Sequence, residues 1–111
     1  MTLSLPLLHL DPRAALQAIR EGAWLVDVRE GHEVTRLGYG VERLLLMPLS
    51  DFERRHTELP ADADLILACA AGGRSQQAMN YLRHLGHRRV RNLTGGMAAW
   101  LAHGLPVRGG G

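Results

Sequence analysis

The chain has 111 residues, of which 46% are hydrophobic, and a formal net charge of +2. This length suits one domain with its own core and is too short for two. No apolar run approaches the roughly 20 residues that a membrane-spanning helix needs, so we expect no membrane association. Every cation is an arginine, and the one basic cluster lacks the interleaved aromatic residues that stack on bases. We therefore expect Arg88, Arg89 and Arg91 to form a solvated surface and to bind no nucleic acid.

The first part of the chain carries signals of one helix, two strands and a further short helix. Asp11 to Gly22 combines an aspartate cap, a proline in the first turn and a terminal glycine, which predicts a helix. Trp24–Val28 is apolar and rich in β-forming residues, which predicts a strand buried on both faces of a parallel sheet. Leu44–Met47 is a second such strand. Ser50, with a glutamate three residues later, has the spacing of a capping box.

The remainder of the chain continues this alternation of strands and helices. Leu65–Cys69 and Val90–Leu93 are predicted strands, Ser75–Leu85 is an amphipathic helix, and Gly96–His103 is the last helix. This order predicts an α/β domain with a largely parallel sheet and right-handed crossovers. We expect the glycine pair before the last helix to allow a tight turn, with a second anion site there as the alternative.

Cys69 is the only cysteine, and a lone thiol excludes an intramolecular disulfide framework and a multi-cysteine metal site. A reducing cytoplasm is the expected compartment. His84 and His87 lie three residues apart, but a zinc site needs further ligands that the other histidines do not provide by their spacing. We therefore expect neither a bound metal nor a cofactor.

The residues after Cys69 favour chemistry over simple packing, although a buried cysteine that fills space is the alternative. Cys69 ends a predicted strand, at the edge where parallel sheets bind ligands. The loop that follows consists of small residues, Ala70, Ala71, Gly72 and Gly73. Its exposed amides and the positive end of the next helix would lower the pKa of the thiol and make Cys69 a nucleophile. Arg74 adds a fork suited to an oxyanion, and Ser75 is the expected helix cap.

These motifs together resemble the single-domain rhodanese-like sulfurtransferases. LVDVRE (Leu25–Glu30) is similar to the strand signature of the family. CAAGGRS (Cys69–Ser75) is similar to its C-x-x-G-x-R-S active-site loop, and VRNLTGGMAAW (Val90–Trp100) to its closing strand, double glycine and tryptophan helix. The similarity covers roughly residues 7 to 107. We expect residues 1–111 to form one domain in which 108–111 are a flexible tail.

The resemblance implies a five-stranded, mostly parallel sheet flanked by helices on both faces. It implies that Cys69 carries a persulfide sulfur during turnover and that Ala70–Ser75 form the amide cradle around it. The implied partners are a small sulfur donor such as thiosulfate and an acceptor, which is cyanide or a thiol. Since the chain has no second cysteine, an external acceptor is required, and a sulfur-accepting protein is one option.

One stretch departs from the family pattern. Members usually carry a Gly-His-Ile-x-Gly-Ala turn before the central strand, whereas the corresponding Tyr39–Leu44 reads YGVERL, with extra length upstream. Within Gly31–Arg43 the helix signal is confined to Glu33–Leu37. The resemblance therefore does not predict the local backbone, or the wall of the pocket that this segment forms.

Two alternative functions remain beside sulfur transfer. Dual-specificity phosphatases and arsenate reductases share the architecture, but their loops hold one more residue between cysteine and arginine than the four found here. The shorter loop makes a smaller ring of amides, which suits one sulfur atom better than a phosphate. The other alternative is a non-catalytic sulfur carrier or partner-binding module.

Asp27 and Arg29 lie at the end of the predicted strand Trp24–Val28, near the edge that binds ligands. They have two possible roles, to orient a substrate or to form an ion pair that braces the loop. We favour the supporting ion pair.

Overall fold

The computed structural model describes residues 8–109. Its centre is a five-stranded parallel sheet with the strand order β1-β6-β5-β2-β4. The strands are β1 (His9–Leu10), β2 (Trp24–Asp27), β4 (Leu44–Leu46), β5 (Leu65–Ala68) and β6 (Val90–Leu93). The predicted α/β fold with a five-stranded parallel sheet is confirmed, and β1 is a strand that the sequence pattern did not indicate.

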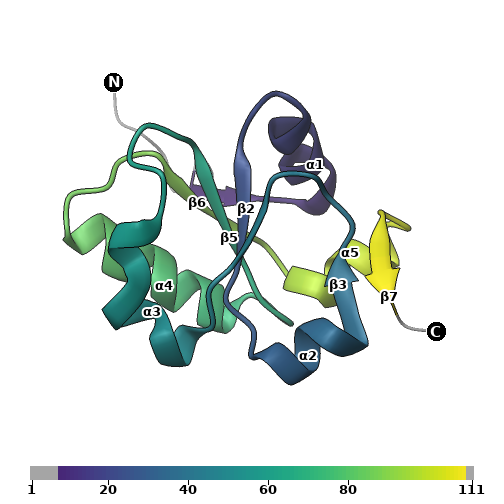
Figure 1. Ribbon diagram of the computed structural model, residues 1–111. Coiled ribbons are helices and arrows are strands. Elements are labelled where there is room, and N and C mark those ends of the chain that lie inside the picture. Colours follow the sequence, from purple (N-terminus) through teal and green to yellow (C-terminus); the bar gives the residue numbers. More distant parts are fainter. Residues whose placement is uncertain (1–7, 110–111) are drawn as a thin grey trace.

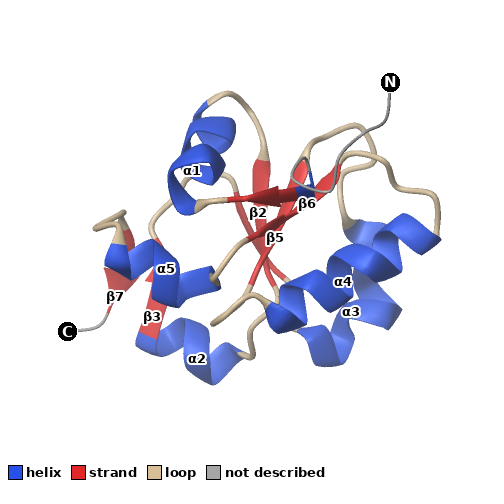
Figure 2. Ribbon diagram, turned by 180° about the vertical axis from the view of Figure 1, so that it is seen from behind, coloured by secondary structure: helices blue, strands red, loops and turns tan. Residues whose placement is uncertain are grey.

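Helices cover both faces of the sheet, as Figure 1 and Figure 2 show. One face packs against α1 (Pro12–Arg20) and α5 (Gly96–Ala102), and the other against α3 (Leu49–Arg55) and α4 (Gly73–His84). Because β2 and β5 lie in the middle, their side chains alternate between the two cores, with Leu25 and Ile66 in one and Val26 and Leu67 in the other. Each face of the central strands is thus buried under a pair of helices.

A second, two-stranded antiparallel sheet joins β3 (Leu37–Tyr39) to β7 (Val107–Gly109). It follows α2 (Gly31–Arg36), so the helix expected at Glu33–Leu37 begins earlier and ends one residue sooner than predicted. Of the predicted flexible tail at 108–111, Arg108 and Gly109 lie in β7, and the last two residues lie outside the described part. Pairing with β3 gives the backbone of these residues hydrogen-bond partners that the sequence alone did not indicate.

The helix caps show which local signals are reliable. The Asp11 carboxylate accepts a hydrogen bond from the Ala14 amide at 2.8 Å, as predicted for the start of α1. The predicted capping box at Ser50 is wrong, because α3 already begins at Leu49 after Pro48. The Ser50 hydroxyl instead donates to Glu30 Oε1 at 2.8 Å.

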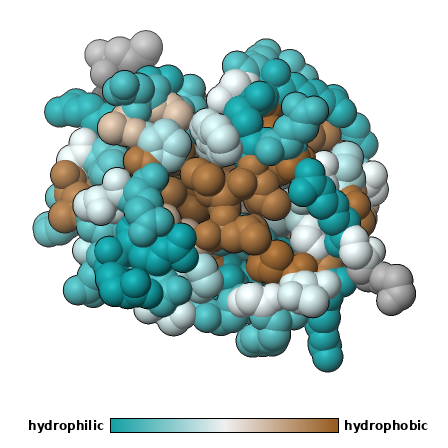
Figure 3. Space-filling model, viewed as in Figure 1, coloured by the Kyte–Doolittle hydropathy of each residue, from teal (hydrophilic) through white to brown (hydrophobic). Residues whose placement is uncertain are grey.

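The surface is mostly hydrophilic on the face shown in Figure 3, around a hydrophobic area in its middle. Strand β4 lies at the edge of the sheet, and its Leu46 side chain is 47% exposed. Among residues 8–109, no helix has both the length and the apolar character required to cross a membrane.

Replacing the α1 cap tests how much this local signal contributes to the fold. We expect Asp11→Ala to lower the free energy of unfolding by about 1 kcal/mol, because the Ala14 amide loses its acceptor. Urea denaturation measures the change. Asp11→Asn keeps an acceptor and should stay close to the wild-type stability, so equal losses in both variants would contradict the capping role.

Candidate active site

Cys69 follows the last residue of β5, at the carboxyl edge of the parallel sheet. Its side chain is buried, with 1% exposure. The sulfur accepts hydrogen bonds from the Gly72 amide at 3.0 Å and the Ser75 amide at 3.3 Å, and the Ser75 hydroxyl lies 3.2 Å away. The loop therefore wraps the thiol in donors, as the pattern of small residues suggested.

Two opposing effects set the acidity of this thiol. Burial acts to raise the pKa of Cys69, because it penalises the charged form. Hydrogen bonds from the Ser75 hydroxyl and from the amides of Ser75, Ala71 and Gly72 favour the thiolate more strongly, so the pKa lies below its usual value. A lowered pKa favours the thiolate, which is the form of cysteine that acts as a nucleophile.

Two carbonyls at the start of the loop are bound by α5. The Cys69 carbonyl accepts from the Met97 amide at 2.9 Å, and the Ala70 carbonyl accepts from the Ala98 amide at 3.1 Å. The amides of Met97 and Ala98 are therefore engaged by the loop. The first turn of α5 fixes the orientation of the loop.

Gly96 makes this close approach possible. It has a φ of +54°, and a Cβ there would lie 2.7 Å from the Ala70 carbonyl carbon and 2.8 Å from the Ala71 amide nitrogen. Only glycine therefore fits between the Cys69 loop and α5.

Ser75 is not the cap that the sequence predicted. Helix α4 begins at Gly73 after Gly72, whose φ of +102° lets the chain enter the helix earlier. Ser75 is thus inside the first turn and fully buried, and its hydroxyl oxygen lies 3.2 Å from the Gly72 carbonyl oxygen and 3.2 Å from the Cys69 sulfur. This places the hydroxyl next to the Cys69 sulfur.

Arg74 is held by Glu33, a residue that the sequence analysis did not single out. The two guanidinium arms donate to the two carboxylate oxygens, each at 2.7 Å. Hydrogen bonding from Arg74 lowers the pKa of Glu33 to about 2. The fork expected to meet an oxyanion therefore already binds an anion of the chain itself.

Asp27 and Arg29 form the buried ion pair that was favoured for them. Arg29 Nη2 donates to Asp27 Oδ2 at 2.7 Å, Arg29 Nε donates to Oδ1 at 3.0 Å, and the two residues are 0% and 4% exposed. The guanidinium also lies over the ring of Tyr39, 5.2 Å from its centroid. Arg29 therefore contacts both Asp27 and the Tyr39 ring.

Tyr39 is the second residue that the sequence analysis missed. Its hydroxyl donates to the Cys69 carbonyl at 2.7 Å, and its ring packs edge-on against Trp100 at a centroid distance of 5.2 Å. Burial raises the pKa of Tyr39 well above its usual value, so the phenol keeps the proton that it donates. Its only sequence signal was its place in the stretch that departs from the family pattern.

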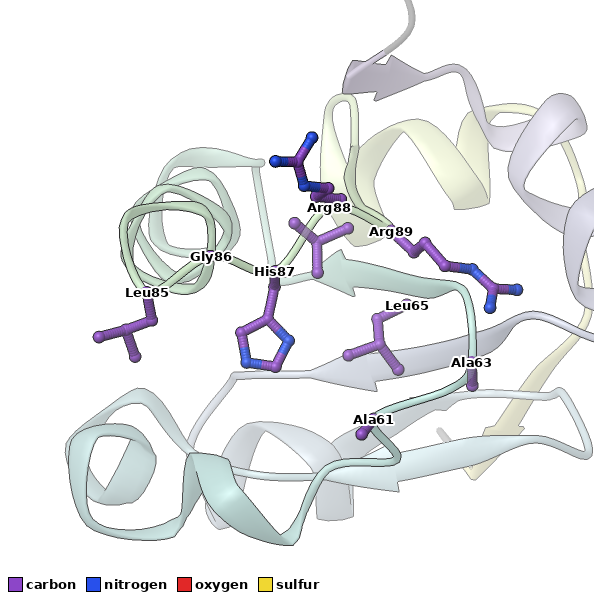
Figure 4. A pocket seen from close by; sticks show the side chains of 9 residues that line it. Ala61, Ala63, Leu65, Leu85, Gly86, His87, Arg88 and Arg89 are labelled. Atoms are coloured by element: carbon purple, nitrogen blue, oxygen red, sulfur yellow. The ribbon is translucent and has the colours of Figure 1, made fainter.

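A separate cavity of about 350 Å³ lies at the opposite end of the sheet (Figure 4). Leu65 and Val90, which begin β5 and β6, line it together with Arg88 and Arg89. Arg89 is paired with Asp64 at 3.0 Å. Within residues 8–109, no group of three histidine, cysteine or carboxylate side chains is arranged to hold a metal ion.

Comparisons with known proteins agree with this geometry. The model of the rhodanese-like domain matches residues 11–103. A sulfurtransferase of Allochromatium vinosum is 40% identical over 87 residues, which cover 78% of this chain and 79% of that protein. A thiosulfate sulfurtransferase of Ectopseudomonas mendocina is 36% identical, over 85% of this chain and 84% of its own. The polysulfide-sulfur transferase homodimer of Wolinella succinogenes has a similar structure, with a TM-score of 0.80, 26% identity and coverage of 91% and 77%.

The contact between α5 and the loop generates a stability prediction. We expect Gly96→Ala to cost about 3 kcal/mol, because the new methyl group meets backbone atoms and the positive φ becomes strained. Thermal and urea unfolding measure the loss. Gly31→Ala is the matched control, since a Cβ there meets nothing within 4 Å and its φ is ordinary. Equal stabilities of the two variants would contradict the tight packing inferred at Gly96.

The Ser75 hydroxyl generates a prediction about the thiol. We expect Ser75→Ala to raise the pKa of Cys69, because one donor to the thiolate is lost while the Ser75 amide is kept. The pH dependence of the alkylation rate should therefore shift to higher pH. Ser50→Ala, which removes a hydroxyl at α3, should leave the profile in place. An unshifted profile for Ser75→Ala would mean that its hydroxyl serves only the Gly72 carbonyl.

Proposed function

Because the chain belongs to the rhodanese-like family of sulfurtransferases, we propose that it moves a sulfane sulfur from a donor to a thiophilic acceptor through a persulfide on Cys69. One observation carries the proposal: the only thiol of the chain lies under the amides of Gly72 and Ser75, which stabilise a negative charge on sulfur.

In the first step, the Cys69 thiolate attacks the outer sulfur of a donor such as thiosulfate. The sulfur–sulfur bond of the donor breaks, and sulfite leaves with the electron pair. The product is a persulfide whose terminal sulfur carries the negative charge. The loop amides of Ala70–Ser75 form the cradle for that charge, as they do for the thiolate.

In the second step, cyanide or a thiol attacks the terminal sulfur and releases the Cys69 thiolate. The scheme is a double displacement, so we expect ping-pong kinetics. No other cysteine exists in the chain to take the sulfur, so the acceptor is a separate small molecule or protein. Neither a metal nor a cofactor has a part in either step.

The other predicted residues have supporting roles in this scheme. Arg74 binds the anionic donor when the donor displaces the Glu33 carboxylate from the guanidinium. The Asp27–Arg29 pair stabilises the loop through Tyr39. We propose that the chain is one domain, and that it works in a reducing compartment such as the cytoplasm, where a lone thiol stays free.

Thiosulfate is the donor that the relative from Ectopseudomonas mendocina supports, since that protein is a thiosulfate sulfurtransferase. The relative from Wolinella succinogenes is a polysulfide-sulfur transferase, which makes polysulfide a second donor to assay. A phosphatase activity is disfavoured by the loop of four residues between Cys69 and Arg74. A sulfur carrier without turnover would also form the persulfide on Cys69, but it would not transfer the terminal sulfur to cyanide.

Replacing the thiol tests the proposal directly. We expect Cys69→Ser to abolish thiosulfate:cyanide sulfur transfer and to leave the melting temperature nearly unchanged, because serine is similar in size but does not form the persulfide. Intact-protein mass spectrometry of the wild type should show a gain of one sulfur atom after thiosulfate, lost again on adding cyanide.

The mass measurement and an added assay with a phosphate ester separate the alternative functions. A gain of one sulfur that cyanide does not remove indicates a carrier, and turnover of a phosphate ester that requires Cys69 indicates a phosphatase. Retention of most sulfur transfer by Cys69→Ser would falsify the mechanism.

A further inference from the structure

The geometry points to Glu33 as the residue that makes the site select sulfur donors by their charge. We propose that its carboxylate, bound to Arg74, makes the site favour singly charged sulfane donors over the dianion thiosulfate. This inference rests on the proposed function and specifies the class of substrate for the same site.

Glu33 occupies both arms of the Arg74 guanidinium. Arg74 is the one cation in the loop Cys69–Ser75, and both of its arms donate to Glu33 at 2.7 Å. A bidentate pair of this kind fixes the planar fork and leaves the guanidinium charge largely neutralised. An arriving anion must compete with a carboxylate that is part of the chain.

Glu30 adds a second negative charge beside the Arg74–Glu33 pair. The Glu30 amide donates to Glu33 at 2.9 Å, and the Glu30 carboxylate accepts the Ser50 hydroxyl from α3. Two carboxylates thus lie beside one guanidinium, next to a loop that stabilises a thiolate. Since like charges repel at short range, each additional negative charge on a donor is disfavoured.

The Glu33 carboxylate stays ionised near neutral pH. The pKa of Glu33 is lowered to about 2, first by hydrogen bonding from Arg74. The charge of Cys69 is also among the influences that raise the pKa of Arg74, after the hydrogen bond and the charge of Glu33. Arg74 also directly precedes Ser75, whose amide donates to the Cys69 sulfur at 3.3 Å, so the ion pair lies beside the loop that holds the thiol.

The test compares two donors that differ by one charge. In methanethiosulfonate, a methyl group replaces one anionic oxygen of thiosulfate, and the outer sulfur is kept. In both cases the Cys69 thiolate attacks that sulfur, the donor sulfur–sulfur bond breaks, and the leaving group takes the electron pair. The leaving group is sulfite from thiosulfate and methanesulfinate from the analogue.

The variant Glu33→Gln removes the carboxylate charge and keeps a similar shape. The quantity measured is kcat/KM for thiosulfate divided by kcat/KM for methanethiosulfonate, with cyanide as acceptor. We expect this ratio to rise about fivefold, the effect of one unit charge at close range in water. Glu33→Asp retains the charge and should keep the ratio near that of the wild type.

The matched control is Asp64→Asn. Asp64 also pairs with an arginine, Arg89, and the substitution changes the net charge equally. Because this pair lies at the end of the sheet opposite Cys69, the donor ratio should not change. A melting curve for each variant shows that it is folded.

An unchanged ratio in Glu33→Gln, or an equal loss with both donors, overturns the inference and leaves Glu33 as a support of Arg74. Calorimetry adds a readout without turnover: thiosulfate should bind more tightly to the double variant with Cys69→Ser and Glu33→Gln than to Cys69→Ser alone. If the wild type accepts sulfur from neither donor, it is the proposed function that fails.

Discussion

The whole site depends on the orientation of two peptide groups, those that carry the Cys69 and Ala70 carbonyls. Both carbonyls accept hydrogen bonds from the first turn of α5. These two bonds hold the beginning of the loop on α5, while the Gly72 and Ser75 amides further along the loop donate to the sulfur. Packing between α5 and the loop therefore helps to fix the surroundings of the thiol, with Gly96 at a point of close approach.

Two layers of charge surround this loop, and they differ in their exposure to water. The inner layer is the Asp27–Arg29 pair, which is buried, stacked on Tyr39 and satisfied by several hydrogen bonds. Removing one partner of such a pair leaves an uncompensated buried charge, which is far more costly than the pair itself. The outer layer is the Arg74–Glu33 pair, which is partly exposed, so water screens its charges more than those of the inner pair.

The sequence was sufficient for the parallel sheet and the Cys69 loop, because both follow from short contiguous patterns. Apolar runs identify β2, β4, β5 and β6, and the small residues after Cys69 identify the cradle. The predictions of helix caps were less successful. Asp11 caps its helix as predicted, whereas Ser50 and Ser75 lie inside first turns that begin after Pro48 and Gly72.

Glu33 and Tyr39 were missed for a different reason. Each makes its key contact with a residue more than a helix and a strand away along the chain, Arg74 in one case and Cys69 in the other. Both also lie in the stretch where the chain departs from the family pattern. The pairing of β3 with β7 and the packing of Tyr39 on Trp100 help to place this stretch beside the loop, and such long-range contacts leave no periodic signal in a single sequence.

The groups that hold the Cys69 carbonyl come from widely separated parts of the chain, Tyr39 before it and Met97 after it. A nascent or unfolded chain has neither contact, so its cysteine has the weak acidity of a free amino acid thiol. The environment that lowers the pKa of the Cys69 thiol is therefore complete only after the last helix has docked on the loop.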